Sequence, residues 1–593
     1  MLYPQQNDRR NLIDLSGFWD FCLDPDDVGV EAGWMNGLAN PRQIAVPASW
    51  NEQFQDTHDY LGAAWYLRRF YAPSGWRGQR IAVRVDSANY AAELWLNGQR
   101  LGDHEGGHLP FAFDVTDRIA WDAPNLLAIR VDAELTSTRV PPGNVPGGLG
   151  ALMSNYPASS FDFFPFGGLQ RPVILTAIPT THITDVRVTT AIDGGDGLVT
   201  VTVTQNVDNG RGQLLLTDGK TTVSAALDFA SGSATTSLRV PKAKLWGPGH
   251  PHLYTLTVTL EEAGAVTDRY SLDVGIRTVS VQGSQILLNG SPIFLTGFGR
   301  HEDFPVHGRG LNLPVVIKDH ALMQWIGANS YRTSHYPYAE EQLQLADRLG
   351  ILVIDETPAV GLFFEDGEEG IATRLARSRE QLESLIARDK NYACVIAWSV
   401  ANEPVPPDFM QRLRSPAPLP APPESTAFFQ TLLEDAHRLD ATRPATFAAL
   451  GGCPLEWMAL CDIVLVNRYF GWYSQSGQLD IAEKALEQEL DMLDAALHRP
   501  IVISEFGADT LPGCHADPPT LWSEEYQVEF LRRYLDVAAR KPYVAGLHVW
   551  NLADFKTAQA IMRAGGLNHK GVFTRDRQPK MAAHFLRSRW SQS

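Results

Sequence analysis

The chain has 593 residues, of which 44% are hydrophobic, and its formal net charge at pH 7 is −18. This length and apolar content predict a globular protein of about three or four domains. The excess of acidic residues argues against nucleic acid or an anionic membrane as a partner, because such partners are bound by clustered Lys and Arg. Any anionic ligand would have to be held by local cations.

The cysteines and the opening segment bear on the cellular compartment. The cysteines are scattered and lack the C-x-x-C spacing of a zinc or redox site; they are Cys22, Cys394, Cys453, Cys461 and Cys514. The opening MLYPQQNDRRNLIDLSGFWDF has no apolar core of a signal peptide, and no apolar run is long enough to span a membrane. These features favour a cytoplasmic protein in a reducing environment.

The first part of the chain has the pattern of antiparallel β-structure. The pair Asn97-Gly98 between two extended segments is typical of a two-residue hairpin, and the flanking segments alternate apolar and polar residues. Residues 1–180 are therefore predicted to form a β-sandwich. Residues 181–279, rich in β-branched side chains, predict a second all-β domain of immunoglobulin-like size.

From residue 280 to residue 593, extended and helical patterns alternate. The helical segments have apolar residues at spacings of three and four. The predicted strands lie within residues 292–302, 328–336, 351–357, 394–403, 444–450, 463–469, 500–506 and 544–552. This alternation predicts a parallel (β/α)₈ barrel, with a doubly wound open sheet as the alternative.

Two carboxylates follow apolar strands of this predicted barrel. Asn402 and Glu403 end the fourth strand, and Glu505 ends the seventh. Barrel enzymes place their chemistry at the carboxyl ends of the strands, and the spacing fits three βα units of about 31 residues each. A single strand-end Glu often only caps a helix or pairs with Arg. Two facing carboxylates favour glycoside hydrolysis, with one acid and one nucleophile or base.

The segments NSYRTSHYPY, DKNYACVIAWSVANEP and ISEFG resemble signature segments of glycoside hydrolase family 2, and similar segments recur along nearly the whole chain. The resemblance implies a jelly-roll domain, an immunoglobulin-like domain and a catalytic barrel. It also implies a retaining mechanism, with Glu403 as acid/base and Glu505 as nucleophile. Such a mechanism requires Glu403 to be protonated and Glu505 to be ionised at neutral pH.

The same resemblance assigns further residues to substrate binding. It places Asn402 on the sugar 2-hydroxyl, Tyr469 as a donor to Glu505, and His335 near the acid/base. The remaining residues that it places around the sugar are Asn467, Tyr473 and Trp550. Each aromatic residue alone would more often belong to a core than to a ligand site.

The segment IMRAGGLNHKGVF bears on the identity of the sugar. Its Asn568 and Lys570 match an Asn-x-Lys motif of the family's β-glucuronidases that binds the uronate carboxylate, and Arg563 lies nearby. A buried carboxylate requires such compensating charge. The resemblance therefore implies a retaining exo-β-glucuronidase. β-Galacturonidase and β-galactosidase are the alternatives within the family, and a non-catalytic carbohydrate-binding protein is the alternative outside it.

Two departures from the family pattern affect this interpretation. Leu567 is an additional residue between Arg563 and the motif, which makes the reach of Arg563 uncertain from sequence. Asp162 matches the position that contacts the sugar 4-hydroxyl, but Phe161 precedes it where bacterial relatives often have His. Because the residues around Asp162 differ from those of these relatives, β-galacturonidase activity stays an alternative.

The loops and partners complete the expectations. The proline-rich insertion 404–424 is predicted to be too stiff for a helix and is a candidate wall for the leaving group. The short segment FFEDGEEG after the third strand predicts an open site.

The residues His301, Glu302, Asp303 and His307 lack the spacing of a metal site. The sequence predicts no cofactor and no metal, a small glucuronide or oligosaccharide as substrate, and, by family resemblance, a homodimer or homotetramer.

Overall fold

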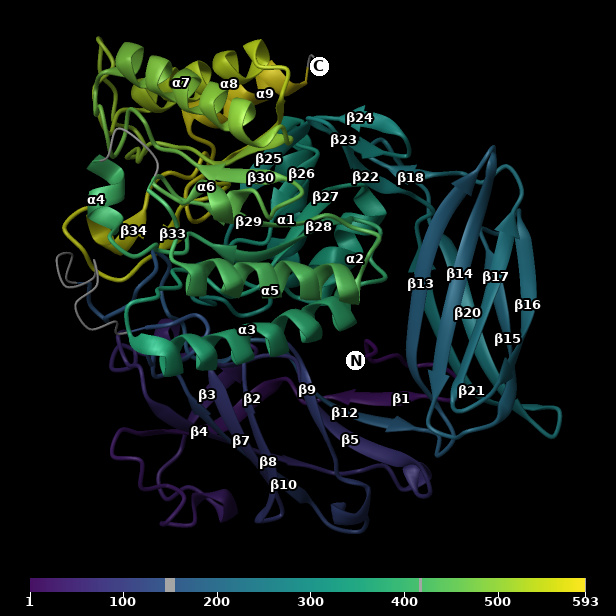
Figure 1. The fold of residues 1–593 in the computed structure, drawn as a ribbon. Coiled ribbons are helices and arrows are strands. Elements are labelled where there is room, and N and C mark those ends of the chain that lie inside the picture. Colours follow the sequence, from purple (N-terminus) through teal and green to yellow (C-terminus); the bar gives the residue numbers. More distant parts are fainter. Residues whose placement is uncertain (144–154, 415–418, 592–593) are drawn as a thin grey trace.

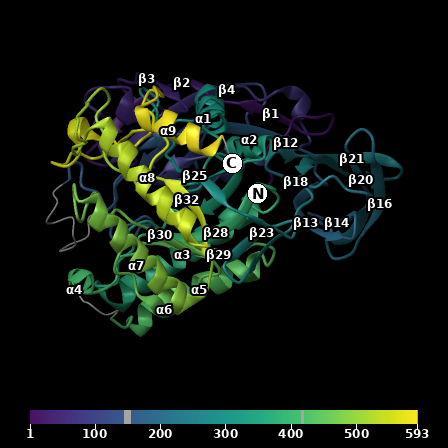
Figure 2. The same ribbon diagram turned by 90° about the horizontal axis from the view of Figure 1, so that it is seen from above.

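The computed structural model describes residues 1–143, 155–414 and 419–591. Figure 1 shows the N-terminal strands below the barrel and the strands β13 to β21 on its right. In the view turned by 90°, β13 to β21 again lie to one side of the barrel (Figure 2). The first domain is therefore positioned to contribute loops to the barrel, whereas most of the second stands away from it.

The first domain is a sandwich of antiparallel sheets. One sheet has the strand order β1-β12-β5-β9, and the other has the order β3-β2-β4-β10-β7-β8. Buried Trp19, Trp50 and Tyr66 fill the core between them. The strands are β1 (Asn11–Asp14), β2 (Gly17–Asp24), β3 (Arg42–Val46), β4 (Ala63–Phe70), β5 (Arg80–Val85), β6 (Ala88–Asn89), β7 (Ala91–Leu96), β8 (Gln99–Glu105), β9 (Phe111–Asp114), β10 (Asn125–Asp132), β11 (Gly168–Leu169) and β12 (Val173–Ile178).

The predicted hairpin at Asn97-Gly98 is confirmed and joins β7 to β8. Both residues have positive φ, 52° for Asn97 and 78° for Gly98. Asn and Gly tolerate this left-handed conformation better than other residues, and it matches the twist of the paired strands.

The second domain packs two antiparallel sheets of orders β13-β14-β17 and β16-β15-β20-β21. Alternate residues of β14 are buried, as expected for a strand with one face against a core. The strands are β13 (Ile183–Asp193), β14 (Asp196–Gln205), β15 (Gly210–Thr217), β16 (Thr222–Phe229), β17 (Ser233–Val240), β18 (Trp246–Gly247), β19 (His250–Pro251), β20 (Tyr254–Glu262) and β21 (Ala265–Val274). A small sheet of β22 (Val279–Gln282), β23 (Gln285–Leu288) and β24 (Ser291–Ile293) leads into the barrel.

The strands of the third domain close into a parallel barrel, as predicted. They are β25 (Leu295–Gly299), β26 (Ser330–Arg332), β27 (Leu352–Glu356), β28 (Val395–Asn402), β29 (Ala445–Ala449), β30 (Val464–Asn467), β31 (Ile501–Glu505) and β32 (Val544–Val549). Every residue of β28 and β31 is buried, because the helices cover the outer face of the barrel. The alternative of an open sheet is wrong, since β25 pairs with β32.

Helices surround the barrel in both views (Figures 1 and 2). They are α1 (Leu313–Ile326), α2 (Glu340–Leu349), α3 (Gly367–Asp389), α4 (Phe409–Arg414), α5 (Pro423–Leu439), α6 (Leu455–Met458), α7 (Leu479–Leu497), α8 (Glu524–Arg540) and α9 (Met581–Trp590). After β32, the short strands β33 (Phe555–Lys556) and β34 (Leu567–Asn568) pair at the mouth. None of the helices among the described residues combines the length and apolar character needed to cross a membrane.

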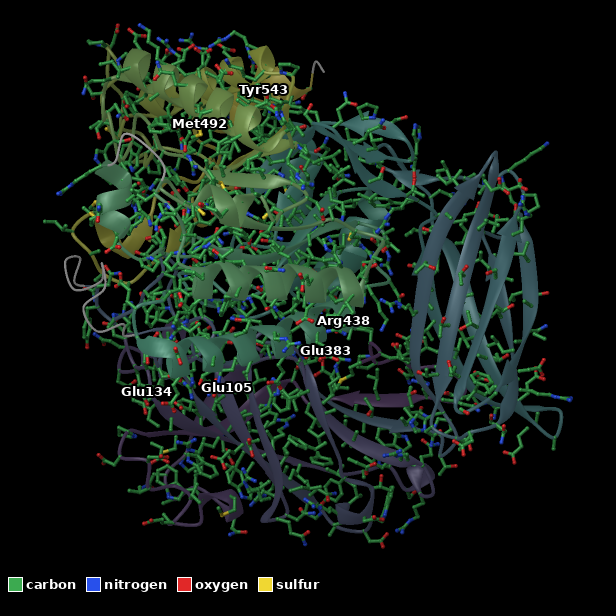
Figure 3. All side chains as sticks on the ribbon, in the orientation of Figure 1. Glu105, Glu134, Glu383, Arg438, Met492 and Tyr543 are labelled. Atoms are coloured by element: carbon green, nitrogen blue, oxygen red, sulfur yellow. The ribbon has the colours of Figure 1, made fainter. Side chains whose placement is uncertain are left out.

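The first domain contacts the barrel through α3. Arg377 Nη1 lies 3.1 Å from Glu105 Oε1 at the end of β8, and Figure 3 labels Glu105 at this junction. Deeper in the interface, the buried Arg171 Nη2 lies 3.0 Å from Glu302 Oε2. These ion pairs fix the first domain against the barrel, so that its loops have a defined position at the mouth.

The proline-rich insertion differs from the expectation that it would exclude helix. Phe409–Arg414 form α4, and α5 begins at Pro423. The prolines lie outside the six residues of α4, and Pro423 occupies the first turn of α5, where a missing N–H costs no hydrogen bond. Residues 415–418 of the insertion lie outside the described part of the chain.

Candidate active site

The first candidate carboxylate lies at the end of β28. Glu403 directly follows the strand and has a φ of 45°. Asn467, the last residue of β30, donates its amide to Glu403 Oε1 at 2.9 Å and to Asn402 Oδ1 at 3.1 Å. Ser504 donates to Asn467 Oδ1 at 2.8 Å and so orients this amide. Side chains from the ends of β30 and β31 therefore fix the side-chain orientations of Asn402 and Glu403.

The second carboxylate ends β31 and accepts several donors. Tyr469 donates its hydroxyl to Glu505 Oε2 at 2.6 Å, and Arg332 Nη2 donates to Glu505 Oε1. His335 Nε2 lies 3.6 Å from the same Oε1. The structure thus places His335 directly beside Glu505.

Arg332 links the strand ends of this region. From the end of β26 it donates to both oxygens of Glu356 at 2.8 and 2.9 Å and to Asn402 Oδ1 at 3.2 Å, in addition to Glu505. Its side chain is fully buried. Ser399 also donates to Glu356, at 2.8 Å. We call Arg332 with Glu356, Glu403 and Glu505 the carboxylate centre.

Burial raises the pKa of both candidate carboxyl groups above the ordinary Glu value of 4.5. For Glu403 the amide of Asn467 opposes this rise. For Glu505 burial raises the pKa, a charged Glu403 would raise it further, and Arg332 and Tyr469 oppose the rise. The two groups compete for ionisation, as closely placed carboxylates do.

An aromatic wall lies next to the carboxylate centre. The ring of Trp550, directly after β32, stacks on His335 with centroids 5.0 Å apart and planes 16° apart. Nδ1 of His335 lies 3.0 Å from Glu356 Oε1, which holds the imidazole in place. Burial lowers the pKa of His335 well below its ordinary value, so the ring is neutral at neutral pH.

A second group of polar side chains surrounds Lys570. Its ammonium donates to Asp509 Oδ2 and to the hydroxyl of Tyr473, the latter at 2.9 Å. The Lys570 side chain is fully buried. The backbone N–H of Lys570 donates to Asn568 Oδ1 at 3.0 Å, which fixes the amide orientation.

Arg563 joins the same group despite the additional residue Leu567. It donates to both oxygens of Asp162 at 2.8 and 2.7 Å, and to the hydroxyl of Tyr473 at 3.1 Å. Asn568 also donates to Asp162, at 2.7 Å. Asp162 comes from the first domain, and its side chain is 44% exposed. We call Arg563, Asn568 and Lys570 the basic cluster.

The basic cluster and the carboxylate centre lie at the same mouth. Lys570 Nζ is 5.8 Å from the ring centroid of Tyr469, whose hydroxyl donates to Glu505. The rings of Tyr469 and Tyr473 meet edge to face, 5.2 Å apart. Tyr469 therefore contacts both groups, Lys570 through its ring and Glu505 through its hydroxyl.

The sequence analysis named neither Arg332 nor Asp509 as a site residue. Arg332 belongs to a segment that resembled the family and ends a barrel strand, so its position was a usable signal. Asp509 lies four residues after Glu505 in a loop, and no periodic pattern marks loop positions.

A cavity of about 1030 Å³ lies beside the basic cluster, between the first domain and the loop joining β33 to β34. Arg563 and Leu567 line it, whereas the candidate carboxylates do not. Two charged groups of its wall are paired with each other, since Lys556 Nζ lies 2.9 Å from Glu52 Oε1. Among the described residues, no group of His, Cys, Asp and Glu is arranged to hold a metal ion.

Comparison with known proteins gives one family along the chain. Family models match residues 12–179 (glycosyl hydrolases family 2, sugar binding domain), 181–277 (glycosyl hydrolases family 2) and 279–593 (glycosyl hydrolases family 2, TIM barrel domain). A β-glucuronidase of Paenibacillus borealis is 39% identical, covering 100% of this chain and 99% of the relative.

Solved structures agree. The crystal structure of the Ruminococcus gnavus β-glucuronidase superposes with a TM-score of 0.91 at 37% identity, over 99% of both chains. The structure of that enzyme in complex with D-glucuronic acid superposes with a TM-score of 0.89 at 36% identity, also over 99% of both chains. The chain described here belongs to glycoside hydrolase family 2.

Proposed function

We propose that this protein is a retaining exo-β-glucuronidase that hydrolyses terminal β-D-glucuronides. The observation that carries the proposal is the buried Lys570, which lies with Arg563 and Asn568 at the same mouth as Glu505, with Tyr469 in contact with both Lys570 and Glu505. A neutral sugar would not require these cations, whereas a uronate carboxylate is costly to bury without them. The names of the relatives support the same substrate.

The basic cluster keeps hydrogen-bond donors available for a ligand. An ammonium has three N–H donors, and Lys570 uses one on Asp509 and one on Tyr473. Asn568 uses one of its two amide N–H donors on Asp162. The remaining donors would bind the two oxygens of a uronate carboxylate in charge-assisted hydrogen bonds.

Binding of the uronate carboxylate by the basic cluster determines the remaining substrate contacts. With the carboxylate on the basic cluster, the sugar O4 lies toward Asp162 and the anomeric carbon toward Glu505. The Oδ1 of Asn402 accepts from Arg332 and Asn467, which leaves the amide NH₂ of Asn402 to donate to the sugar 2-hydroxyl. Trp550 supplies an aromatic face beside the ring.

The hydrogen-bond donors decide which carboxyl group holds the proton in the free site. Glu505 accepts from the Arg332 guanidinium and the Tyr469 hydroxyl, and both favour its ionised form. Among the described residues, Glu403 accepts a side-chain bond only from the neutral amide of Asn467. We therefore assign the proton to Glu403, although burial raises the pKa of both groups.

The reaction then proceeds in two steps. The carboxylate of Glu505 attacks the anomeric carbon while Glu403 gives its proton to the leaving oxygen, and a glycosyl-enzyme ester forms. Esterification removes the charge of Glu505, which lowers the cost of ionising Glu403. Glu403 then takes a proton from water as the water cleaves the ester, which restores both groups. The sugar is released with retained β configuration.

The test is the initial rate with a matched set of aryl β-glycosides: glucuronide, galacturonide, glucoside and galactoside. A preference for the glucuronide, together with a β-anomer as the first product in NMR spectra, is the expected result. A preference for the galacturonide would keep the role of Lys570 and reverse the role of Asp162. Equal or faster cleavage of the neutral sugars would show that the basic cluster is not a carboxylate site.

The cellular setting forms part of the proposal. All five cysteines lie in the described part of the chain and are free, which supports a reducing, cytoplasmic compartment. The homo-oligomeric state rests on family resemblance and is tested by light scattering of the purified protein. The insertion 404–424 stays a predicted wall of the leaving-group site, tested by comparing small and bulky aryl groups.

A further inference from the structure

Asp509 lies next to the basic cluster and bonds to Lys570, to Arg563 and to the backbone of the Asn-x-Lys motif. Its Oδ1 accepts the backbone N–H of His569 at 2.8 Å, inside the Asn-x-Lys motif. Its Oδ2 accepts the Lys570 ammonium and lies 3.4 Å from Arg563 Nη1. The Asp509 side chain is 1% exposed. Asp509 therefore touches the cations of the cluster from the side away from solvent.

Asp509 is charged in this position. Burial alone would raise its pKa, but Lys570 and Arg563 outweigh burial and hold the pKa below its ordinary value. Among the described residues it is the carboxylate that bonds the buried Lys570 ammonium. Without it, the Tyr473 hydroxyl would be the one hydrogen-bond partner left to the ammonium among the described residues, and a buried charge without a counter-ion is unfavourable.

The backbone that carries Asp509 also carries Glu505, and it has little freedom to move. Between them, a Cβ built on Gly507 would lie 1.9 Å from the carbonyl oxygen of Trp550, so the two backbones are in close contact. Thr510 N–H donates to the His569 carbonyl at 3.0 Å on the other side of Asp509. The segment thus connects the basic cluster rigidly to the carboxylate centre.

We propose that Asp509 is a positioning residue that determines the preference for uronides. It sets Lys570 and Arg563 at a fixed distance from Glu505, so that a sugar anchored by its carboxylate presents its anomeric carbon to the nucleophile. The inference rests on the proposed glucuronidase function. Asp509 does not touch the substrate, because Lys570 and Arg563 lie between it and the site.

The test is Asp509→Asn, which keeps the size of the side chain and an oxygen that can accept from His569. The expected result is a fall of at least about 30-fold in kcat/KM for the aryl glucuronide, mainly through KM. kcat/KM for the aryl glucoside changes by no more than about threefold, since a neutral sugar does not use the cations.

Asp268→Asn is the matched control. Asp268, on β21 of the second domain, is also buried, and it accepts from the buried Arg10 guanidinium at 2.9 and 2.6 Å, in a different domain from the basic cluster. Its loss should lower the melting temperature and affect both sugars alike. If kcat/KM falls equally for the glucuronide and the glucoside in Asp509→Asn, Asp509 has only a structural role, like the control residue. A higher kcat/KM for the glucuronide would identify it as a competing anion instead.

A binding measurement separates this inference from the proposed function. Calorimetry of D-glucuronic acid and D-glucose with Glu505→Gln and with the double variant Glu505→Gln/Asp509→Asn reports recognition without turnover. Weaker glucuronic acid binding in the double variant supports the inference even if the wild-type protein prefers another glycoside. Unchanged binding, or no binding of glucuronic acid to either variant, would overturn it.

Discussion

The carboxylate centre and the basic cluster share one mouth but are built differently. Arg332, Glu403 and Glu505 lie at or directly after the ends of barrel strands. Arg563 and Asp162 come from loops, one after β33 and one from the first domain. Strand ends are fixed by the hydrogen-bonded barrel, whereas loops tolerate insertions. In the proposed function, the reaction therefore depends on the barrel, and the choice of sugar depends on the loops packed around it.

The two regions also differ in charge. The carboxylate centre sets one guanidinium against three carboxyl groups, so a proton on Glu403 reduces the repulsion. The basic cluster sets the cations Arg563 and Lys570 against Asp162 and Asp509. The first region therefore has excess negative charge, which favours a proton on one carboxyl group, whereas the charges of the second region balance and leave its free N–H donors to a ligand.

Replacing Glu505, the proposed nucleophile, should have the largest effect. Glu505→Gln keeps the size of the side chain but cannot form the ester, and we expect kcat to fall by at least about 10⁴-fold. The measurement is kcat with an aryl glucuronide, with the melting temperature as a control for folding. A fall of only about tenfold would show that another group attacks the sugar.

Removing the Arg332 guanidinium, which Glu356 and Glu505 share, should have the second-largest effect. Arg332→Met leaves Glu356 and Glu505 buried without their cation, which should lower the free energy of unfolding by about 3–5 kcal/mol. We expect kcat to fall by about 10²- to 10³-fold. Urea unfolding and kcat are measured together. Arg211→Met, at an exposed pair with Asp228, is the control and should change neither.

Removing the cation of the basic cluster should affect one class of sugar. Lys570→Ala is expected to lower kcat/KM for the glucuronide by about 100-fold, equivalent to about 3 kcal/mol. The rate with the glucoside should stay close to that of the wild type. The ratio of the two rates is the readout, and an unchanged ratio would contradict the division between the two regions.

The pH dependence should reflect the carboxylate centre alone. In the proposed mechanism, activity requires ionised Glu505, so kcat/KM should fall as the pH drops below the pKa of Glu505. It also requires protonated Glu403, so kcat/KM should fall as the pH rises above the pKa of Glu403. Burial raises both pKa values above 4.5, so both limbs should lie above that pH. On each limb kcat/KM should change about tenfold per pH unit. An acid limb at or below pH 4.5 would contradict the assignment.

The smallest effect is expected at the edge of the basic cluster. Tyr473→Phe removes a hydroxyl that accepts from Lys570 and Arg563, and a hydrogen bond of this kind contributes about 0.5–1.5 kcal/mol. KM for the glucuronide should rise by about three- to tenfold. kcat should stay unchanged, because Tyr473 does not contact Glu505. A fall in kcat instead would place Tyr473 in the carboxylate centre.

The sequence by itself determined the hairpin at Asn97-Gly98, the barrel strands, and the placement of Glu403 and Glu505 at the ends of β28 and β31. Local backbone preference and hydrophobic periodicity act over a few residues, so sequence patterns report them directly. The helix α4 was missed because proline content was weighed without regard to where the prolines lie.

Only the tertiary structure decided which distant side chains meet. Asp162 and Arg563 are bonded although about two thirds of the chain separates them, and Asp509 reaches Lys570 from another loop. Such contacts depend on domain packing and loop paths, which no local pattern encodes. The burial that shifts the pKa values of Glu403 and Glu505 likewise arises when the barrel closes and is covered, since desolvation is a property of the folded surroundings and not of the residue.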